Sequence, residues 1–223
     1  VAASARRENL LKDLNNQNPN IHPFPLDVKN EDETKNIFQN IIKKFETVDI
    51  SVFCTGIHDP DAEKKLSSEK IREIMETNFF GTLNCIMAVN TYFREKKSGH
   101  ISIVSSVAGY RGLPAASGYC ASKSALTSLA ESLYFDFKRH NVRVSLVSPG
   151  FIQTPMTDKN KFPMPMIKSP EFAAEKMFIG LTKKNSFEIH FPIAFTTIMK
   201  LFKIMPNWLY FFLIKKGMKG IKY

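Results

Sequence analysis

Three side chains between residues 106 and 123 could together interconvert an alcohol and a carbonyl group. They are the hydroxyl of Ser106, the phenol of Tyr119 and the ammonium of Lys123. Tyr119 and Lys123 are four residues apart, so on a helix they share one face. A fixed cation lowers the pKa of a nearby phenol, which lets the phenol exchange protons with an alcohol or carbonyl oxygen. A serine hydroxyl aimed at the same oxygen would orient the substrate.

The spacing Tyr-x-x-x-Lys alone does not identify the reactive tyrosine, because the chain contains it three times. The pairs are Tyr92/Lys96, Tyr119/Lys123 and Tyr134/Lys138. Thirteen residues upstream of the second tyrosine stands Ser106, whereas Phe79 and Ala121 hold that place for the other two and cannot polarise a carbonyl. We therefore expect Tyr119 to be the reactive phenol and the other two tyrosines to be ordinary residues of amphipathic helices.

Apolar strands alternate with helical segments along the chain. Strands are predicted at 1–5, 21–26, 49–55, 101–106, 142–147 and 187–191, and helices at 30–45, 68–92, 117–140 and 171–183. Continuous apolar strands joined by helices indicate an α/β fold whose parallel sheet is covered on both faces. Ligands of such sheets bind at the carboxyl ends of the strands. Asp27, Gly56, Ser106 and Gly150 are all predicted to lie there.

The segment ISIVSSVAGYRGLPAASGYCASKSAL at 101–126, followed by VSPGFIQTP at 147–155, closely resembles the catalytic part of the short-chain dehydrogenase/reductase family. The resemblance extends from residue 1 to about residue 192. It implies a Rossmann-like, doubly wound parallel sheet and an oxidoreductase that transfers hydride between NAD(P) and a substrate. We assign 1–192 to this domain and 193–223 to a basic, aromatic helical tail.

The resemblance makes Asn78 the fourth catalytic residue beside Ser106, Tyr119 and Lys123. In the family such an asparagine holds a water molecule that relays protons to the lysine. An asparagine inside a helix can also open the helix locally, and the alternative is that Asn78 is a surface residue. The resemblance further implies that Tyr119 protonates the substrate oxygen, and that Lys123 lowers the pKa of the phenol and binds the cofactor ribose.

The glycine-rich turn that normally holds a dinucleotide pyrophosphate does not occur in this sequence. Neither G-x-G-x-x-G nor the family's TGxxxGxG is present, so we expect the first strand and helix to lie upstream of Val1. The chain as supplied is expected to bind cofactor poorly or to fold incompletely. Arg6 follows Ala5, which stands where NAD enzymes carry an acid, and this favours NADP(H) over NAD(H). The alternative is a solvated, basic start of a helix.

Further cofactor contacts follow from the same resemblance. Asp27 corresponds to an aspartate that hydrogen-bonds the adenine, although it could equally cap a turn. FCTG at 53–56 stands where the family usually has Asn-Asn-Ala-Gly, so Gly56 is kept and both asparagines are lost. The segment 149–154 matches the part that holds the nicotinamide amide, with Thr154 supplying a hydroxyl. The expected cofactor-binding set is Arg6, Asp27, Val28, Gly56, Tyr119, Lys123, Pro149, Gly150, Ile152 and Thr154.

Composition narrows the class of protein. A chain of 223 residues with 43% hydrophobic and 23% charged residues is typical of one globular α/β domain. The net charge of +10 lacks the aromatic interleaving of a nucleic-acid binder. No two histidines have metal-ligand spacing, so we expect no metal site. The three cysteines predict buried free thiols in a reducing compartment and hence a cytoplasmic protein.

Two segments bear on substrate and partners. Residues 156–170 occupy the family's variable substrate-covering loop, and its methionines with Phe162 predict an apolar lid over a hydrophobic alcohol or ketone. Past Pro192 the chain carries lysines and no acid, and its longest uncharged run, 204–214, is too short to span a bilayer. The tail either packs on its own fold or a second subunit, or lies on an anionic membrane surface at the cytoplasmic face.

The sequence thus predicts an NADP-preferring oxidoreductase. By resemblance, the helices that hold Asn78 and Tyr119 would join a homodimer or homotetramer. The rival hypothesis is a non-catalytic relative that serves as a binding or scaffold subunit. The altered FCTG segment and the absent glycine-rich turn favour the rival, and the intact catalytic residues favour the enzyme.

Overall fold

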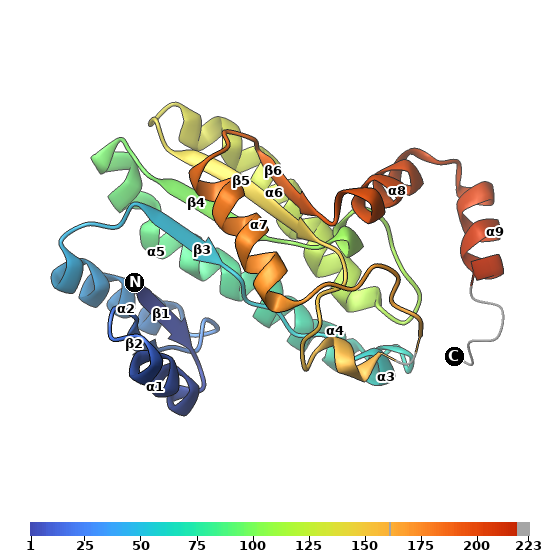
Figure 1. The fold of residues 1–223 in the computed structure, drawn as a ribbon, viewed down its shortest axis with the longest axis horizontal. Helices are drawn as coiled ribbons and strands as arrows, with labels where there is room; N and C mark the ends of the chain where they lie inside the picture. The colour runs from blue at the N-terminus through green and yellow to red at the C-terminus, as the bar shows by residue number, and fades with distance from the viewer. Residues whose placement is uncertain (161, 218–223) are drawn as a thin grey trace.

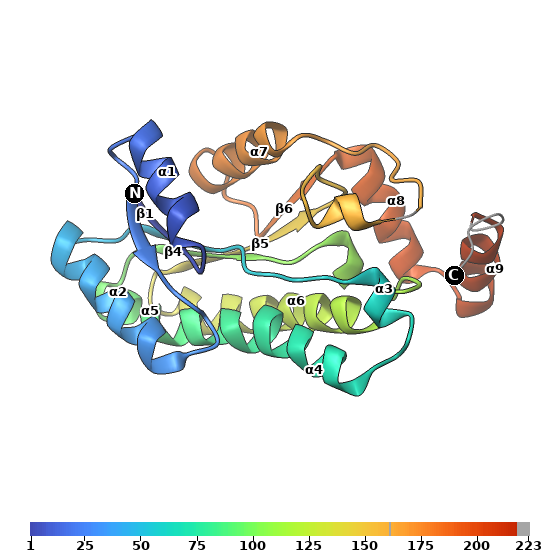
Figure 2. The ribbon, with the colours of Figure 1, turned by 90° about the horizontal axis from the view of Figure 1, so that it is seen from below.

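The computed structural model describes residues 1–160 and 162–217, and it shows parallel strands covered by helices on both faces (Figures 1 and 2). The strands are β1 (Ala2–Ala5), β2 (His22–Pro25), β3 (Ile50–Phe53), β4 (His100–Val104), β5 (Arg143–Pro149) and β6 (Glu188–Phe191). Each hydrogen-bonded pair of these strands runs parallel. The α/β class predicted from the alternation of apolar strands and helices is confirmed.

The helices form two layers. Figure 2 shows α2, α4, α5 and α6 along one face of the strands and α1 and α7 over the other. Their bounds are α1 (Glu8–Gln17), α2 (Glu31–Phe45), α3 (Pro60–Glu63), α4 (Ser68–Met75), α5 (Gly81–Lys96), α6 (Ser117–Lys138), α7 (Pro170–Thr182), α8 (Ile193–Ile204) and α9 (Asn207–Gly217). A parallel sheet has to be covered on both faces, because its strands are apolar on both sides.

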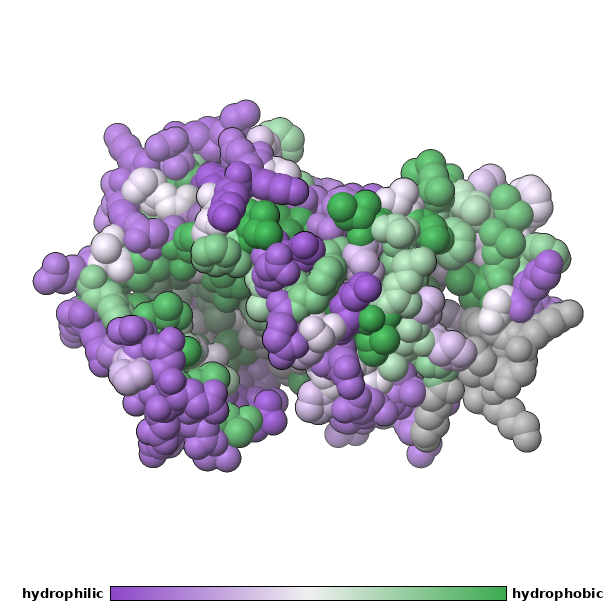
Figure 3. Space-filling model, viewed as in Figure 1, coloured by the Kyte–Doolittle hydropathy of each residue, from purple (hydrophilic) through white to green (hydrophobic). Residues whose placement is uncertain are grey.

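The strands form two sections. One section pairs β1 with β2, and the other contains β3, β4, β5 and β6 in that order. Within the described residues no backbone pairing joins β1 to β3, and a groove of about 1300 Å³ lies between them. Figure 3 shows this groove as a hollow in the left half of the molecule, with hydrophobic residues on its walls. A strand laid between β1 and β3 would complete one doubly wound sheet.

The main core lies between strands β4 and β5 and helices α5 and α6. All five residues of β4 are buried, and Phe93 and Phe137 pack against it with at most 1% of their surface exposed. Removing this much apolar surface from water is the chief favourable contribution to folding. Gly99 allows the turn before β4, because its φ is +137° and a Cβ there would lie 2.2 Å from the Phe93 ring.

Local sequence signals mark where several helices begin. The side chain of Asn30 accepts a hydrogen bond from the Glu33 N–H at 3.0 Å and so caps α2, where the sequence predicts a helix from residue 30. Ser169 caps α7 in the same way through the Phe172 N–H at 3.3 Å. Both predicted helix starts are therefore confirmed.

The predicted tail, 193–223, contains the helices α8 and α9. Its last residues, 218–223, lie outside the described part of the chain. Part of it packs on its own fold. The Arg111 guanidinium lies 4.0 Å from the centroid of the Tyr210 ring and donates to the Met205 carbonyl at 2.6 Å. Tyr210 is buried by this contact. Nowhere in the described ranges does a helix have the length and apolar character that crossing a bilayer requires.

Candidate active site

Four of the predicted site residues lie just past the carboxyl ends of four strands. Asp27 follows β2, Gly56 follows β3, Ser106 follows β4, and Gly150 comes directly after β5. Because neighbouring strands run parallel within each section, their carboxyl ends face the same way. Open α/β sheets bind ligands at this edge.

Lys123 lies in the first turns of α6 with its ammonium pointed at the end of β4. Its Nζ donates to the Val104 carbonyl at 2.9 Å and lies 3.5 Å from the Thr55 carbonyl oxygen. The residue is only 3% exposed, and burial lowers the pKa of Lys123 from 10.5 to about 8. Gly56 leaves room for this cation, since a Cβ at Gly56 would lie 3.3 Å from Nζ. The lysine is therefore charged at neutral pH and close to its titration point.

Tyr119 stands one helical turn before Lys123 on α6. Burial raises the pKa of Tyr119 to about 12, and a hydrogen bond with the Ser106 side chain only partly opposes the rise. The expectation of a lowered pKa for this phenol is wrong for this structure. The ammonium of Lys123 lies 5.8 Å from the ring centroid, and the loss of solvation is the largest cause of the raised pKa. The phenol is neutral at pH 7 and can therefore donate a proton.

Ser106 is held by the backbone that follows β4. Its Oγ accepts from the Ala108 N–H at 3.1 Å and so caps the short 3₁₀ turn η2 (Val107–Gly109). The hydroxyl keeps its own proton to donate, because this cap uses the oxygen only as an acceptor. Ser106 can thus offer a hydrogen bond to an oxygen beside the Tyr119 phenol.

Asn78 lies in a π-helical turn, η1 (Glu76–Phe80), between α4 and α5. The sequence predicted one helix over 68–92 that an asparagine could open, and the structure shows that opening as a turn with one extra residue. Its side chain is fully buried, so the surface alternative is wrong. Its Nδ2 donates to the Ile57 carbonyl and to Ser122 Oγ, both at 3.0 Å, and its Oδ1 accepts from the Ile57 N–H at 2.7 Å. Asn78 thereby fixes the chain just past Gly56, beside Lys123.

Predicted cofactor-binding residues that follow the first three strands line the groove. Arg6, Asp27, Val28 and Gly56 all line it. These side chains suit the adenosine and ribose side of a dinucleotide, with a guanidinium for a phosphate and a carboxylate for an amine. Within the described residues, no glycine-rich turn borders the groove to hold a pyrophosphate. The groove therefore fits part of such a cofactor.

Asp27 also has the structural role that the sequence left open. Its Oδ1 accepts from the Lys29 N–H at 3.1 Å, and its Oδ2 lies 3.7 Å from the Lys29 ammonium. The carboxylate thus caps the turn before α2 while it borders the groove. Val28, the next residue, receives a hydrogen bond from Asn84 at its carbonyl at 2.9 Å, which fixes this turn against α5.

The predicted nicotinamide segment lies farther from the groove. Pro149 ends β5, Gly150 donates its N–H to the Phe191 carbonyl at 2.8 Å, and Ile152 bridges to Lys168. The Thr154 N–H donates to the Thr157 hydroxyl at 2.9 Å, so this threonine takes part in a local turn. None of these four lines the groove, but the residues that follow them, Pro155 and Met156, do.

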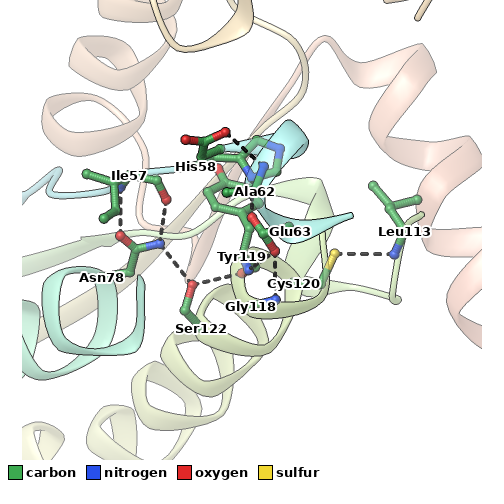
Figure 4. Close-up of polar contacts among 11 residues, drawn as sticks. Ile57, His58, Ala62, Glu63, Asn78, Leu113, Gly118, Tyr119, Cys120 and Ser122 are labelled. Carbon is green, nitrogen blue, oxygen red and sulfur yellow. Dashed lines mark hydrogen bonds and ion pairs between the residues drawn. The ribbon is translucent and has the colours of Figure 1, made fainter. Parts of the chain in front are cut away.

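Two residues at the centre of the site, His58 and Glu63, are not predicted from the sequence. The His58 ring packs against the Tyr119 ring with centroids 4.6 Å apart, and His58 Nδ1 lies 2.6 Å from Glu63 Oε1 (Figure 4). The available signal was Asp59-Pro60, a cap residue followed by a proline, which starts the short helix α3 and buries Glu63 five residues after His58.

The three cysteines are free thiols, as predicted, but only Cys120 is buried. Cys54 is exposed on the groove wall, so the expectation of a buried thiol is wrong for it. In the described ranges, no three His, Cys, Asp or Glu side chains are gathered where they could hold a metal ion.

Comparison with known families matches residues 1–163 to "short chain dehydrogenase". An uncharacterized oxidoreductase from Myxococcus xanthus is 33% identical over 190 residues, which make up 85% of this chain and 75% of that relative. The chain belongs to the short-chain dehydrogenase family. As a short-chain dehydrogenase it is an NAD(P)-dependent oxidoreductase of CH–OH groups.

Two further similarities extend this assignment. A 3-oxoacyl-[acyl-carrier-protein] reductase from Thermotoga maritima is 26% identical over 200 residues, 84% of this chain and 81% of that protein. A short chain dehydrogenase from Burkholderia cenocepacia, solved in complex with NADP, superimposes with a TM-score of 0.80 at 25% identity. That superposition covers 96% of this short-chain dehydrogenase and 85% of the other chain. The Rossmann-like fold predicted from the sequence is thereby confirmed.

Proposed function

We propose that this short-chain dehydrogenase is an NADP-preferring enzyme that interconverts an alcohol and a ketone or aldehyde through Ser106, Tyr119, Lys123 and Asn78. The observation that carries the proposal is the proximity of the Ser106 side chain to the Tyr119 phenol, with a buried ammonium one helical turn away. A bound nicotinamide dinucleotide supplies the hydride for reduction and takes it up in oxidation.

The residues of this chain handle the proton. In reduction the neutral phenol of Tyr119 gives its proton to the substrate oxygen, while the hydroxyl of Ser106 donates a hydrogen bond to that oxygen. The charge of Lys123 stabilises the phenolate that results. Asn78 holds the backbone at Ile57, which keeps the wall beside Lys123 in place. Oxidation follows the same path in reverse and requires the phenolate.

The preference for NADP rests on Arg6, which stands at the end of β1 on the wall of the groove. A guanidinium binds a phosphate through charge-assisted hydrogen bonds, whereas the hydroxyl of NAD offers no charge at that place. The structure of the Burkholderia cenocepacia relative with NADP supports this choice.

Arg6→Ala should weaken the binding of NADPH about 10- to 100-fold and leave the binding of NADH within about twofold. Hydrogen bonds to charged groups contribute about 1.5–3 kcal/mol, and each 1.4 kcal/mol is a factor of ten. Fluorescence titration of the full-length enzyme with each dinucleotide measures both constants. Lys12→Ala, which removes a cation from the exposed face of α1, is the matched control. Equal losses for the two cofactors would exclude the assignment of Arg6.

A hydrophobic substrate is proposed from the residues beyond Ser106. The side chains of Val107, Tyr110, Phe195 and Met199 form an apolar cluster there, with Phe151 and others packed against it. Phe162, in the loop that follows β5, approaches Phe151 with ring centroids 6.0 Å apart. The four side chains of this cluster are buried in the core, so the proposal rests on the apolar loop that contains Phe162, which favours a bulky, uncharged alcohol or ketone over a sugar or an acid.

We also propose that a second copy packs along α5 and α6. Three large apolar side chains on this face, Phe80 at the end of η1, Met87 on α5 and Phe135 on α6, have between 44% and 66% of their surface exposed. Figure 2 shows the two helices on the same outer face of the molecule. Oligomers of this family join through the helices that hold Asn78 and Tyr119, and this apolar surface is where such a contact would form.

A second candidate function is contact with an anionic membrane surface through α8 and α9. Several apolar side chains of these helices are exposed, and Figure 3 shows hydrophobic residues gathered at that end of the molecule. On α9 the exposed Trp208, Phe211 and Phe212 lie on one helical stripe that continues into Lys215 and Lys216. Interfacial helices of peripheral proteins combine aromatic and basic residues in this way.

The triple change of Trp208, Phe211 and Phe212 to serine should abolish sedimentation with phosphatidylglycerol vesicles. Wild type is expected to sediment with them and to stay in solution with phosphatidylcholine alone, because the lysines need anionic headgroups. The control is Phe178→Ser on α7, since Phe178 is 61% exposed against 63% for Phe211. If instead the triple variant changes only the molecular mass by light scattering, a second copy covers the patch and the membrane proposal is wrong.

A further inference from the structure

The helix that carries Tyr119 begins on a carboxylate from another segment. Glu63 Oε2 accepts from the Gly118 N–H at 2.7 Å and from the Tyr119 N–H at 3.1 Å (Figure 4). Ala116, which precedes the helix, has no side-chain acceptor, so α6 lacks a cap of its own. A carboxylate at a helix start satisfies free N–H groups and interacts favourably with the helix dipole. Glu63 therefore fixes the backbone of Tyr119 itself.

The second oxygen of the same carboxylate fixes the ring of Tyr119 through His58. Glu63 Oε1 lies 2.6 Å from His58 Nδ1, and the imidazole lies against the phenol ring at an interplanar angle of 36°. The side chain of Glu63 is fully buried and that of His58 is 11% exposed. One buried carboxylate is thus joined to both ends of Tyr119, the backbone directly and the ring through an imidazole.

His58 also marks where the groove meets the phenol. His58 and Ile57 line the groove, whereas Tyr119, Ser106 and Lys123 do not. The imidazole therefore lies between the open groove and the aromatic face of Tyr119, and it contributes to the burial of that ring. A buried carboxylate is costly to remove from water even when it is hydrogen-bonded, so a role of Glu63 in the site has to be considered.

We propose that Glu63 and His58 are positioning residues that together fix the direction and the solvent cover of the Tyr119 phenol. This inference rests on the proposed role of Tyr119 as the proton donor. Glu63 holds the first turn of α6, and His58 holds the ring over the site and keeps groove water from its face. Neither residue takes the proton. Proton transfer depends steeply on geometry, so a phenol left free to turn transfers its proton more slowly.

His58→Ala and Glu63→Gln should each lower kcat for carbonyl reduction about 10- to 100-fold, with KM changed by less than about twofold. Glu69→Gln, an exposed carboxylate at the start of α4, is the matched control and should behave as wild type. His58→Ala leaves the helix cap intact, so it tests the proposal even if Glu63→Gln does not fold. A change confined to KM would overturn the proposal.

His58→Ala in the Tyr119→Phe background distinguishes a positioning role of His58 from a general loss of structure. With Tyr119→Phe already present, His58→Ala should cause no further loss of the residual rate, because His58 acts only through the phenol. Equal losses in both backgrounds would show that His58 acts elsewhere.

A third measurement does not depend on activity. The absorbance change on ionisation, taken as wild type minus Tyr119→Phe, reports the titration of this one phenol in the full-length protein. His58→Ala should move that titration to lower pH, because the ring gains solvent. If His58→Ala leaves this titration unchanged, His58 does not shield the Tyr119 phenol from solvent. If wild type reduced no carbonyl compound, the proposed function would fall, and this titration would still decide whether His58 covers the phenol.

Discussion

Tyr119→Phe should lower the rate of carbonyl reduction by about 10²- to 10⁴-fold while the fold and cofactor binding persist. The ring and its contact with His58 remain, and only the hydroxyl that faces Ser106 is lost. Positioned general acids contribute rate factors of this size. Stopped-flow or steady-state oxidation of NADPH with a hydrophobic ketone measures the loss, and thermal unfolding checks the fold.

The chain supplies its own matched controls for this experiment. Tyr92 and Tyr134 have the same spacing to a lysine, but Tyr92 accepts a hydrogen bond from the Val48 N–H at 3.0 Å and Tyr134 packs against Phe187. Replacing either by phenylalanine should leave the rate within about threefold, because neither lies at the site. A near wild-type rate in Tyr119→Phe would instead contradict the assignment of Tyr119 as the proton donor.

Lys123→Met should remove most of the activity and change how the enzyme responds to pH. The pKa of Lys123 is about 8, so the wild-type rate of reduction should fall as pH rises through 8 and the ammonium loses its charge. The variant lacks this charge at every pH, and we expect a rate about 10²-fold lower with no such fall near pH 8. A pH profile of kcat for both proteins makes the comparison.

The same substitution has a predicted effect on stability. Burial lowers the pKa of Lys123 from 10.5, so between about pH 8 and 10.5 the unfolded chain binds a proton that the folded chain does not. The free energy of unfolding of wild type should therefore rise with pH in this window relative to Lys123→Met. Lys138→Met, at the end of α6, is the control and should show no such difference. A parallel pH dependence in wild type and Lys123→Met would contradict the assignment.

Structural features that are determined by neighbouring residues could be predicted from the sequence. The cap at Asn30, the apolar strand before Ser106 and the helix that follows residue 117 each depend on a few successive side chains. The approach of Ser106 to Tyr119 could also be predicted, because strand ends and helix starts of a parallel sheet meet at one edge. These features carry most of the fold and the identity of the candidate catalytic residues.

The remaining features depend on contacts between distant segments. The pKa of Tyr119 was predicted in the wrong direction, since the burial of its ring depends on how the chain around His58 folds over it. Glu63 looks like a surface charge in the sequence, and only the fold places it 2.7 Å from the Gly118 N–H. The division of the strands into two sections likewise follows from which edges meet, which no local pattern records.

That division has a consequence for how the enzyme loses its cofactor. Arg6 and Asp27 line one side of the groove and Gly56 the other, and among the residues that the structure describes no backbone hydrogen bonds join β1 to β3. A dinucleotide that binds to both sides of the groove stabilises the folded arrangement by mass action. Without it, the section of β1 and β2, which has few long-range contacts, is expected to open first. In this chain we therefore expect cofactor binding and the folding of the first thirty residues to favour one another, and limited proteolysis with and without NADPH measures this coupling.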